Sequence, residues 1–230
     1  MKFLDILYPP VCPFCGNITN QGICDSCRKQ IQYIREPRCM RCGKPVQTVE
    51  QEYCADCRRQ QYAFNQGRSV WIHRKPVTHG IYQFKFHNKR YYAKIFAGEM
   101  AEQYGGWLRR SGIDIILPVP LHSSKRRRRG FNQAELLAEE LGQLTGIPVN
   151  NQVVYRIRKT RPQKKLNHME RQNNLKGAFG VSSAWKPCKN VLIVDDIYTT
   201  GNTIHRIAKV LKKAGVQKVY FLTISIGQGL

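Results

Sequence analysis

The arrangement of cysteines constrains this chain more than any other feature. Eight of the nine cysteines lie in four CxxC pairs before residue 60, namely Cys12 and Cys15, Cys24 and Cys27, Cys39 and Cys42, and Cys54 and Cys57. One CxxC pair offers two thiolates to a tetrahedral ion at about 2.3 Å, and two pairs complete a closed four-thiolate site. The spacing therefore predicts two structural Zn²⁺ ions in a small N-terminal module.

An iron–sulfur cluster, a redox CxxC or disulfides would use the same residues, but four evenly placed pairs favour zinc. Neighbouring pairs binding one ion each is the simpler assignment, and interleaved ligation would use the same cysteines. Gly16 and Gly43 follow two of the pairs, where the chain often needs a positive φ. The module has few apolar residues, so we expect it to need metal to fold. Cys188 is expected to be an ordinary thiol.

The start of the chain predicts its location. The first eleven residues carry Asp5 and the Pro9-Pro10 pair within a very short apolar run. Such a run is typical neither of a signal peptide nor of a membrane span. We expect a soluble cytoplasmic protein without membrane insertion, in which thiols stay reduced and are available to metal.

Positive charge is concentrated outside the cysteine module. The formal net charge is +23, and the first 60 residues contribute only +3 of it, from nine Lys/Arg against six Asp/Glu. The remaining +20 indicates an anionic partner, because bound phosphates would relieve the repulsion within such a chain.

Apolar patterning after residue 62 predicts alternating strands and helices. Strands are expected at 69–73, 80–86, 113–119, 153–157, 191–194 and 219–226, and helices at 91–108, 132–146 and 203–214. Near-continuous apolar runs such as 191–194 are typical of strands buried on both faces of a parallel sheet. Asn132 and Glu135 match a capping box at a helix start. We therefore predict a zinc module at 1–62 and an α/β domain with a mainly parallel sheet at 63–230.

The run VLIVDDIYTTGNT at 191–203 has the order of a phosphate site. Ligands bind beyond the carboxyl ends of parallel strands, where a helix start presents amides to anions. Asp195 and Asp196 are placed to accept hydrogen bonds from two ribose hydroxyls. The phosphate would lie on the loop formed by Thr199, Thr200, Gly201, Asn202 and Thr203. A ribose 5-phosphate, such as that of phosphoribosyl diphosphate, fits both parts.

This run resembles the phosphoribosyl-diphosphate motif of type I phosphoribosyltransferases. The chain as a whole resembles the ComF/GntX family in its cysteine ribbons and in the segments Pro118-Val119-Pro120-Leu121-His122, Arg129-Gly130-Phe131-Asn132-Gln133 and Arg161…Gln163…Leu166…Arg171…Asn174-Leu175…Ala178-Phe179. The resemblance implies a double zinc ribbon before a phosphoribosyltransferase domain, a role in handling transforming DNA, and competence-machinery proteins as partners. It also implies a pyrophosphate loop at 118–122 and a hood at 158–174.

Two classes of function remain open. A phosphoribosyltransferase needs Mg²⁺ on the diphosphate and an acceptor, which the sequence does not identify. Thr199 stands where the hypoxanthine-guanine branch has Asp, which argues against that activity. The rival is a single-stranded DNA-binding protein that uses the same fold, with Phe131, Tyr155 or Tyr198 stacking on bases. Candidate contacts to diphosphate or nucleic acid are Lys125, Arg126, Arg127, Arg128, Arg129, Arg161, Lys164, Lys165 and Arg171. The run 125–129 is expected in the loop that continues from 118–122, and it also fits a solvated surface.

Overall fold

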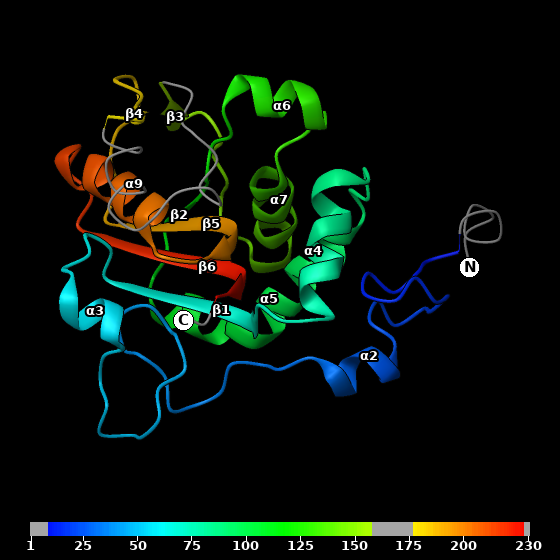
Figure 1. Ribbon diagram of the computed structural model, residues 1–230. Helices are drawn as coiled ribbons and strands as arrows, with labels where there is room; N and C mark the ends of the chain where they lie inside the picture. The colour runs from blue at the N-terminus through cyan, green and yellow to red at the C-terminus, as the bar shows by residue number, and fades with distance from the viewer. Residues whose placement is uncertain (1–8, 158–176, 228–230) are drawn as a thin grey trace.

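The centre of the molecule is a four-stranded parallel sheet (Figure 1). The structure is a computed structural model that describes residues 9–157 and 177–227. Its strands lie in the order β1-β6-β5-β2, with bounds β1 (Gln66–Ile72), β2 (Ile115–Pro118), β5 (Asn190–Tyr198) and β6 (Lys218–Ile226). Each neighbouring pair in this sheet is parallel. The predicted α/β class with a mainly parallel sheet is confirmed.

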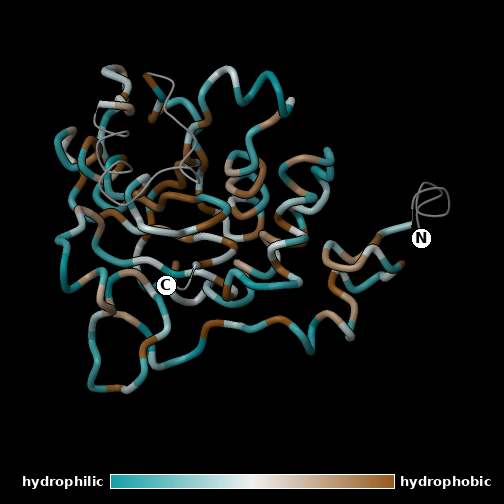
Figure 2. The backbone as a smooth tube through the Cα atoms, in the orientation of Figure 1, coloured by the Kyte–Doolittle hydropathy of each residue, from teal (hydrophilic) through white to brown (hydrophobic). Residues whose placement is uncertain are grey.

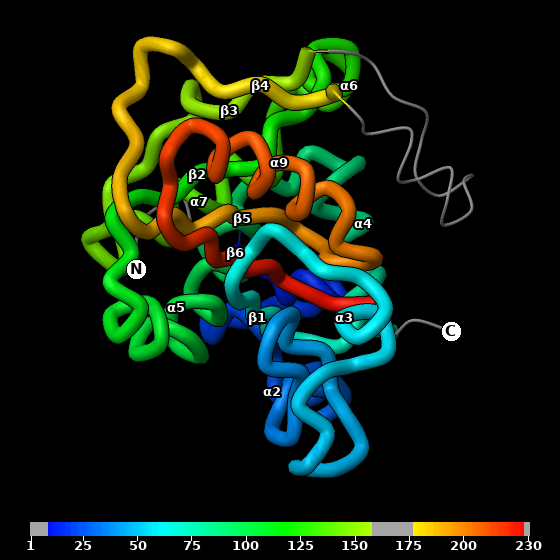
Figure 3. Tube along the Cα trace, turned by 90° about the vertical axis from the view of Figure 1, so that its left-hand side faces the viewer, coloured from blue at the N-terminus to red at the C-terminus, as the bar shows by residue number. Residues whose placement is uncertain are grey.

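Both faces of the sheet are apolar, so both need cover. In β5, Leu192 and Val194 face one hydrophobic cluster, and Val191 and Ile193 face the other. Helices α4 (Val77–Phe86), α5 (Tyr92–Arg110) and α7 (Gln133–Thr145) cover the first face. Helix α9 (Asn202–Lys213) covers the second, as Figure 3 shows. Figure 2 shows hydrophobic residues gathered at the strands between these layers.

Two sequence predictions in this half of the chain are wrong. Residues 80–86 were expected as a strand and belong to α4, because the buried positions Val77, Ile81 and Phe84 recur at helical spacing. The basic run 125–129 was expected in a loop and forms α6 (Ser123–Arg129), which Gly130 ends at φ 78°. Both changes redirect charged side chains, because successive side chains turn by about 100° around a helix, whereas in a strand they alternate between two faces.

A two-stranded antiparallel sheet stands apart from the main one. It consists of β3 (Val154–Arg156) and β4 (Phe179–Val181). The predicted hood at 158–174 joins these strands in sequence, and it lies outside the described residues together with Arg161, Lys164, Lys165 and Arg171.

Asn132 caps α7 by accepting from the Ala134 N–H, whereas both carboxylate oxygens of Glu135 bind Arg126.

The cysteine module lies along β1. It contains the short helices α2 (Asp25–Gln30) and α3 (Ala55–Arg59). Between them the chain follows the outer edge of β1, where the Ile34 N–H donates to the Val70 carbonyl and the Ile72 N–H to the Gln32 carbonyl. This pairing covers a sheet edge that would otherwise expose unpaired backbone groups.

Within the described residues, no helix is long and apolar enough to cross a membrane.

Candidate functional site

The eight CxxC cysteines form two clusters of four. Cys12, Cys15, Cys24 and Cys27 make one, Cys39, Cys42, Cys54 and Cys57 the other, and the sulfurs of each lie within 4.8 Å of one another. A tetrahedral Zn²⁺ with bonds of about 2.3 Å needs sulfurs about 3.8 Å apart. The Sγ atoms of Cys15 and Cys24 are 3.6 Å apart, as are those of Cys42 and Cys54. The residues therefore fit two structural zinc ions, and neighbouring pairs share a site as predicted.

The glycines that follow two of the CxxC pairs have the expected backbone conformation. Gly16 has φ 79° and Gly43 has φ 75°. At Gly43 a Cβ atom would also lie 2.7 Å from the Gly67 carbonyl oxygen in β1. The second cluster thus approaches the sheet through a position that only glycine can occupy.

The predicted phosphate loop lies at the start of α9. Gly201 caps this helix with φ 72°, and a Cβ atom there would lie 2.3 Å from the Tyr198 hydroxyl oxygen. The first amides of a helix have no partner within the helix. A small hollow lies over them, lined by Asp195, Ile197, Tyr198, Thr199, Thr200, Gly201, Asn202, Thr203 and Ile204. The side-chain amide nitrogen of Asn202, Nδ2, is buried and has no hydrogen-bond partner within the described residues.

The two carboxylates lie at the carboxyl end of β5. The Asp196 N–H donates to Asp195 Oδ1 at 2.9 Å, and Lys85 Nζ of α4 lies 2.9 Å from Asp196 Oδ1. Burial raises the pKa of Asp195 to about 7, and repulsion from Asp196 adds to the shift. Lys85 and Arg156 oppose it. Asp195 is therefore a carboxyl group whose charge depends on what binds beside it.

A group of four cations from three elements lies at this site: Lys85 of α4, Lys125 and Arg129 of α6, and Arg156 of β3. Lys85, Arg129 and Arg156 interact with the acidic pair, and Lys125 lies near these three cations. Burial lowers the pKa of Lys125, and repulsion from Arg156, Arg129 and Lys85 lowers it further. Burial also lowers the pKa of Arg129, against the attraction of Asp196 and Asp195. Four cations beside two carboxylates leave positive charge for a further anion.

Helix α6 separates the basic run into two faces. Lys125 and Arg129, four residues apart, are both partly buried, and Arg129 interacts with the acidic pair. The Arg129 guanidinium lies over the Phe86 ring at 4.8 Å and donates to Gln133 Oε1 at 2.8 Å. Arg127 and Arg128 are exposed, and Arg126 forms an ion pair with Glu135 at 3.1 Å. The run is therefore neither wholly solvated nor wholly directed at the site.

The predicted pyrophosphate loop begins beside the acidic strand. Pro118 is in register with Val194, and the Val119 N–H donates to the Val194 carbonyl at 2.9 Å. Pro120 and Leu121 follow, half-buried. His122 caps α6 and accepts from the Ser124 N–H at 3.2 Å. The loop thus lies next to Asp195. His122 was predicted to bind diphosphate as part of this loop, and capping of α6 is a second, purely structural role for it.

Two of the three rings suggested for base stacking are unsuited to it. Phe131 is 5% exposed and packs against Phe84, and Tyr198 is 2% exposed and stacks on Phe221 at 4.7 Å. Both rings are buried in the core, so neither is available to stack on a base. Tyr155 is 49% exposed and is the remaining candidate of the three.

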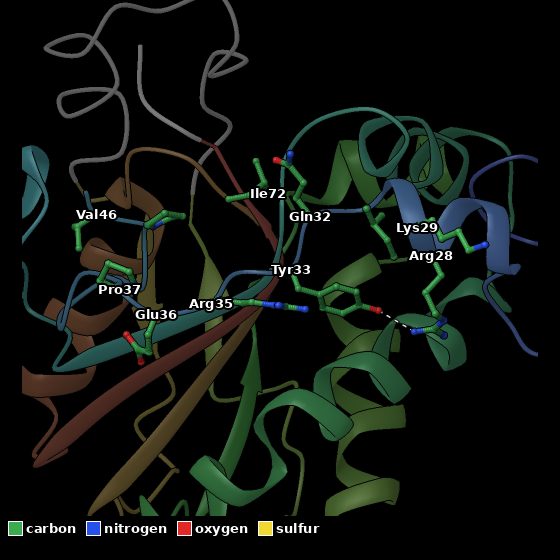
Figure 4. Close-up of a pocket in the computed structure, with 11 residues that line it drawn as sticks. Arg28, Lys29, Gln32, Tyr33, Arg35, Glu36, Pro37, Val46 and Ile72 are labelled. Carbon is green, nitrogen blue, oxygen red and sulfur yellow. Dashed lines mark hydrogen bonds between the residues drawn. The ribbon is translucent and has the colours of Figure 1, made fainter. Parts of the chain in front are cut away.

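A larger hollow, of about 670 Å³, lies between the two ribbons (Figure 4). It is lined by Arg28, Lys29, Ile31, Gln32, Tyr33, Arg35, Glu36, Pro37, Pro45, Val46 and Ile72. Arg28 donates to the Tyr33 hydroxyl, which donates to Glu99 Oε2 of α5 at 2.6 Å. None of the described residues predicted to bind phosphate lines this hollow.

Sequence reasoning missed Lys85, Tyr62 and His205 as parts of the site. Lys85 was placed on a strand, and the spacing of Val77, Ile81 and Phe84 would have revealed the helix that directs it to Asp196. Tyr62 contacts the phosphate loop, and His205 of α9 accepts from the Ala63 N–H, so both bonds join segments far apart in sequence that no local pattern marks.

Comparison with known proteins matches both halves of the chain. The model of the double zinc ribbon domain matches residues 3–58, and that of the phosphoribosyl transferase domain matches residues 127–225. Competence protein F of Haemophilus influenzae is 34% identical over 208 residues, which cover 88% of this chain and 90% of that protein. DNA utilization protein YhgH of Salmonella typhi is 33% identical over 154 residues, covering 66% and 67%.

Among solved structures, a purine phosphoribosyltransferase from Pyrococcus horikoshii Ot3 aligns with a TM-score of 0.38 and 17% identity, over 57% of this chain and 73% of that one. A likeness this low carries no conclusion about activity.

Proposed function

Because the chain belongs to the family of competence protein F and YhgH and has that family's double zinc ribbon and phosphoribosyltransferase domain, we propose that it binds phosphoribosyl diphosphate and serves DNA uptake. One observation carries the proposal. Two carboxylates at the end of β5 lie between an amide-lined helix start and a group of four cations. We also place the protein in the cytoplasm, since eight metal-binding thiols need a reducing compartment.

Each part of the ligand has a matching part of the site. Asp195 and Asp196 accept hydrogen bonds from the two ribose hydroxyls. The backbone amides of the loop 199–203 donate hydrogen bonds to the 5-phosphate. Lys125, Arg129 and Arg156 face the diphosphate, together with the loop 118–122. Lys85 holds Asp196 in place through its ion pair. Mg²⁺ prefers phosphate oxygens and water as ligands, so it would bind together with the diphosphate and partly neutralise the negative charge of the diphosphate.

Replacing Lys125 tests this assignment, because its neighbour Arg127 provides a matched control on the same helix. We expect Lys125→Gln to weaken binding of Mg²⁺-phosphoribosyl diphosphate about tenfold, through loss of one charge-assisted contact. Arg127→Gln removes an exposed charge and should leave the affinity within about twofold. Isothermal titration calorimetry measures both. Equal losses in the two variants would contradict the assignment, because they would reflect net charge alone.

A second candidate function is binding of single-stranded DNA at the outer face of α6. Arg127 and Arg128 are exposed there, and exposed Tyr155 of β3 offers a ring for a base. The net charge of +20 after residue 60 also exceeds what one diphosphate needs.

The salt dependence of DNA binding tests this second function. Each phosphate neutralised on a single strand contributes about −0.7 to the slope of log affinity against log salt. Replacing Arg127 and Arg128 with alanine should therefore flatten the slope by about 1.4, as measured by fluorescence anisotropy at several salt concentrations. Lys125→Gln should change it less. An unaltered slope in the double variant would exclude α6 as a DNA contact.

A further inference from the structure

The segment that leaves the second ribbon is hydrogen-bonded to the predicted phosphate loop. Tyr62 Oη donates to the Thr200 carbonyl oxygen at 2.9 Å, and the Ala63 N–H donates to His205 Nδ1 at 2.9 Å. Tyr62 is 6% exposed, so its hydroxyl makes this contact inside the protein. One bond thus joins the exit of the ribbon to the phosphate loop, and the other joins it to the start of α9.

The Tyr62 bond constrains the backbone of the loop. The peptide unit that links Thr200 to Gly201 is planar and trans, so its carbonyl and N–H point in opposite directions. Because Tyr62 holds the carbonyl toward the ribbon, the Gly201 N–H points the other way. Gly201 lines the small hollow at the start of α9. The bond therefore fixes one of the amides that would receive a phosphate.

Tyr62 belongs to the same buried cluster as the second set of cysteines. Its ring stacks on Phe64 at 4.9 Å and meets His205 edge-on at 5.6 Å. Tyr62 and Phe64 share one buried cluster with Tyr198 of the loop and with the four cysteines Cys39, Cys42, Cys54 and Cys57. Tyr62 follows Cys57 by five residues, and Cys57 itself lies in α3. Metal bound by these cysteines would therefore set the position of Tyr62.

Both side chains keep the protonation that these bonds require. Burial raises the pKa of Tyr62 above its ordinary value, with the charge of Asp56 adding, so the hydroxyl stays a donor. Burial lowers the pKa of His205 to about 4, and Lys209 and Arg206 lower it further. His205 is then neutral at physiological pH, with Nδ1 as acceptor and the proton on Nε2.

The first cysteine cluster lies elsewhere. Cys12 and Cys27 pack with α4 and α5 on the face of the sheet opposite α9. A polar group also joins this ribbon to α5: Arg28 and the Tyr33 hydroxyl, both seen in Figure 4, donate to the two carboxylate oxygens of Glu99. Tyr33 and Tyr62 thus both donate from a ribbon to the domain, and of these two tyrosines Tyr62 is the one that contacts the phosphate loop.

From these contacts we propose that Tyr62 is a positioning residue, through which metal binding at the second four-cysteine site holds the phosphate loop in its anion-binding conformation. The proposal rests on the proposed function, since the anion is the 5-phosphate of phosphoribosyl diphosphate. The first four-cysteine site stabilises the opposite face and does not act on the loop.

The matched pair Tyr62→Phe and Tyr33→Phe tests this coupling in the full-length zinc-loaded protein. Each substitution removes one hydroxyl, and zinc content should stay at the wild-type value in both. For Tyr62→Phe we expect amide hydrogen exchange across residues 199–205 to accelerate, and affinity for Mg²⁺-phosphoribosyl diphosphate to fall about fivefold to tenfold. For Tyr33→Phe we expect wild-type exchange in that segment and wild-type affinity. Exchange is read by mass spectrometry and affinity by calorimetry.

The outcomes separate the coupling from the ligand assignment. Wild-type loop exchange and affinity in Tyr62→Phe would overturn the coupling, as would equal effects of the two substitutions. No binding by the wild-type protein, with the exchange difference intact, would overturn the ligand and support the link between ribbon and loop. Cys57→Ser should accelerate exchange of the loop, and Cys27→Ser should not; the opposite result would also overturn the coupling.

Discussion

Metal analysis of the purified protein is expected to give two zinc ions per chain. The two clusters supply eight thiolates in two sets of four, and each set has the sulfur spacing of a closed tetrahedral site. Cys188 belongs to neither set, so Cys188→Ser should leave the zinc content unchanged. One zinc per chain, or iron in place of zinc, would contradict the assignment.

Removing the metal is expected to produce the largest loss of stability in this protein. Structural zinc sites contribute about 10–16 kcal/mol of binding free energy at neutral pH, and this is also folding free energy. The cysteines of the second site are 0–7% exposed and pack with Val191, Ile193 and Phe221 of the sheet. Chelation should therefore unfold the ribbons and lower the midpoint of thermal unfolding of the whole chain. An unchanged midpoint after complete zinc removal would show that the ribbons are not metal-dependent.

The second large effect is expected from replacing both acidic residues at the end of β5. Asp195→Asn with Asp196→Asn should weaken binding of Mg²⁺-phosphoribosyl diphosphate by about 2 to 4 kcal/mol, because two charge-assisted hydrogen bonds to ribose hydroxyls are lost. Calorimetry measures this change as a roughly 30-fold to 1,000-fold increase in Kd. Asp114→Asn provides a matched control, because Asp114 lies at the opposite end of β5, where it accepts from the Asn190 N–H at 2.7 Å. Equal affinity in the double variant and the wild type would exclude the site.

The raised pKa of Asp195 adds a pH dependence to this prediction. Its pKa is about 7 in the folded protein against an ordinary value of 3.8. Ribose hydroxyls donate to the ionised form, so affinity should increase as pH rises toward about 7 and then level off. Asp195 is also protonated in the folded chain and ionised in the unfolded chain between these two values, so its contribution to folding stability falls as pH rises through that window. Asp195→Asn should lack this component of both profiles.

For the basic residues, the sequence predicted the kind of partner but not the grouping of the side chains. Charge alone predicted an anionic partner, because +20 after residue 60 is excessive for a chain that binds none. It did not predict which cations gather around Asp195. That grouping depends on α6 being a helix, since residues four apart then lie on one face and their neighbours turn outward.

Local spacing determined the parts of this protein that need only one stretch of chain. The CxxC repeats predicted eight thiols that gather in two sets of four, and the run 191–203 predicted a strand, two carboxylates and a helix start in order. These features depend on bond geometry and on apolar burial within a few residues, so they can be read from spacing. The boundary after residue 62 and the roles of the site residues stay predictions.

Tertiary structure decided which distant residues meet. Lys85 reaches Asp196 only because α4 packs against the sheet, and Tyr62 reaches Thr200 only because the second ribbon packs against the α9 face. Pairing of the cysteine clusters was decided in the same way, since neighbouring and interleaved ligation use the same residues. Contacts of this kind depend on how apolar faces pack, and residues far apart in the chain carry no common period that would announce them.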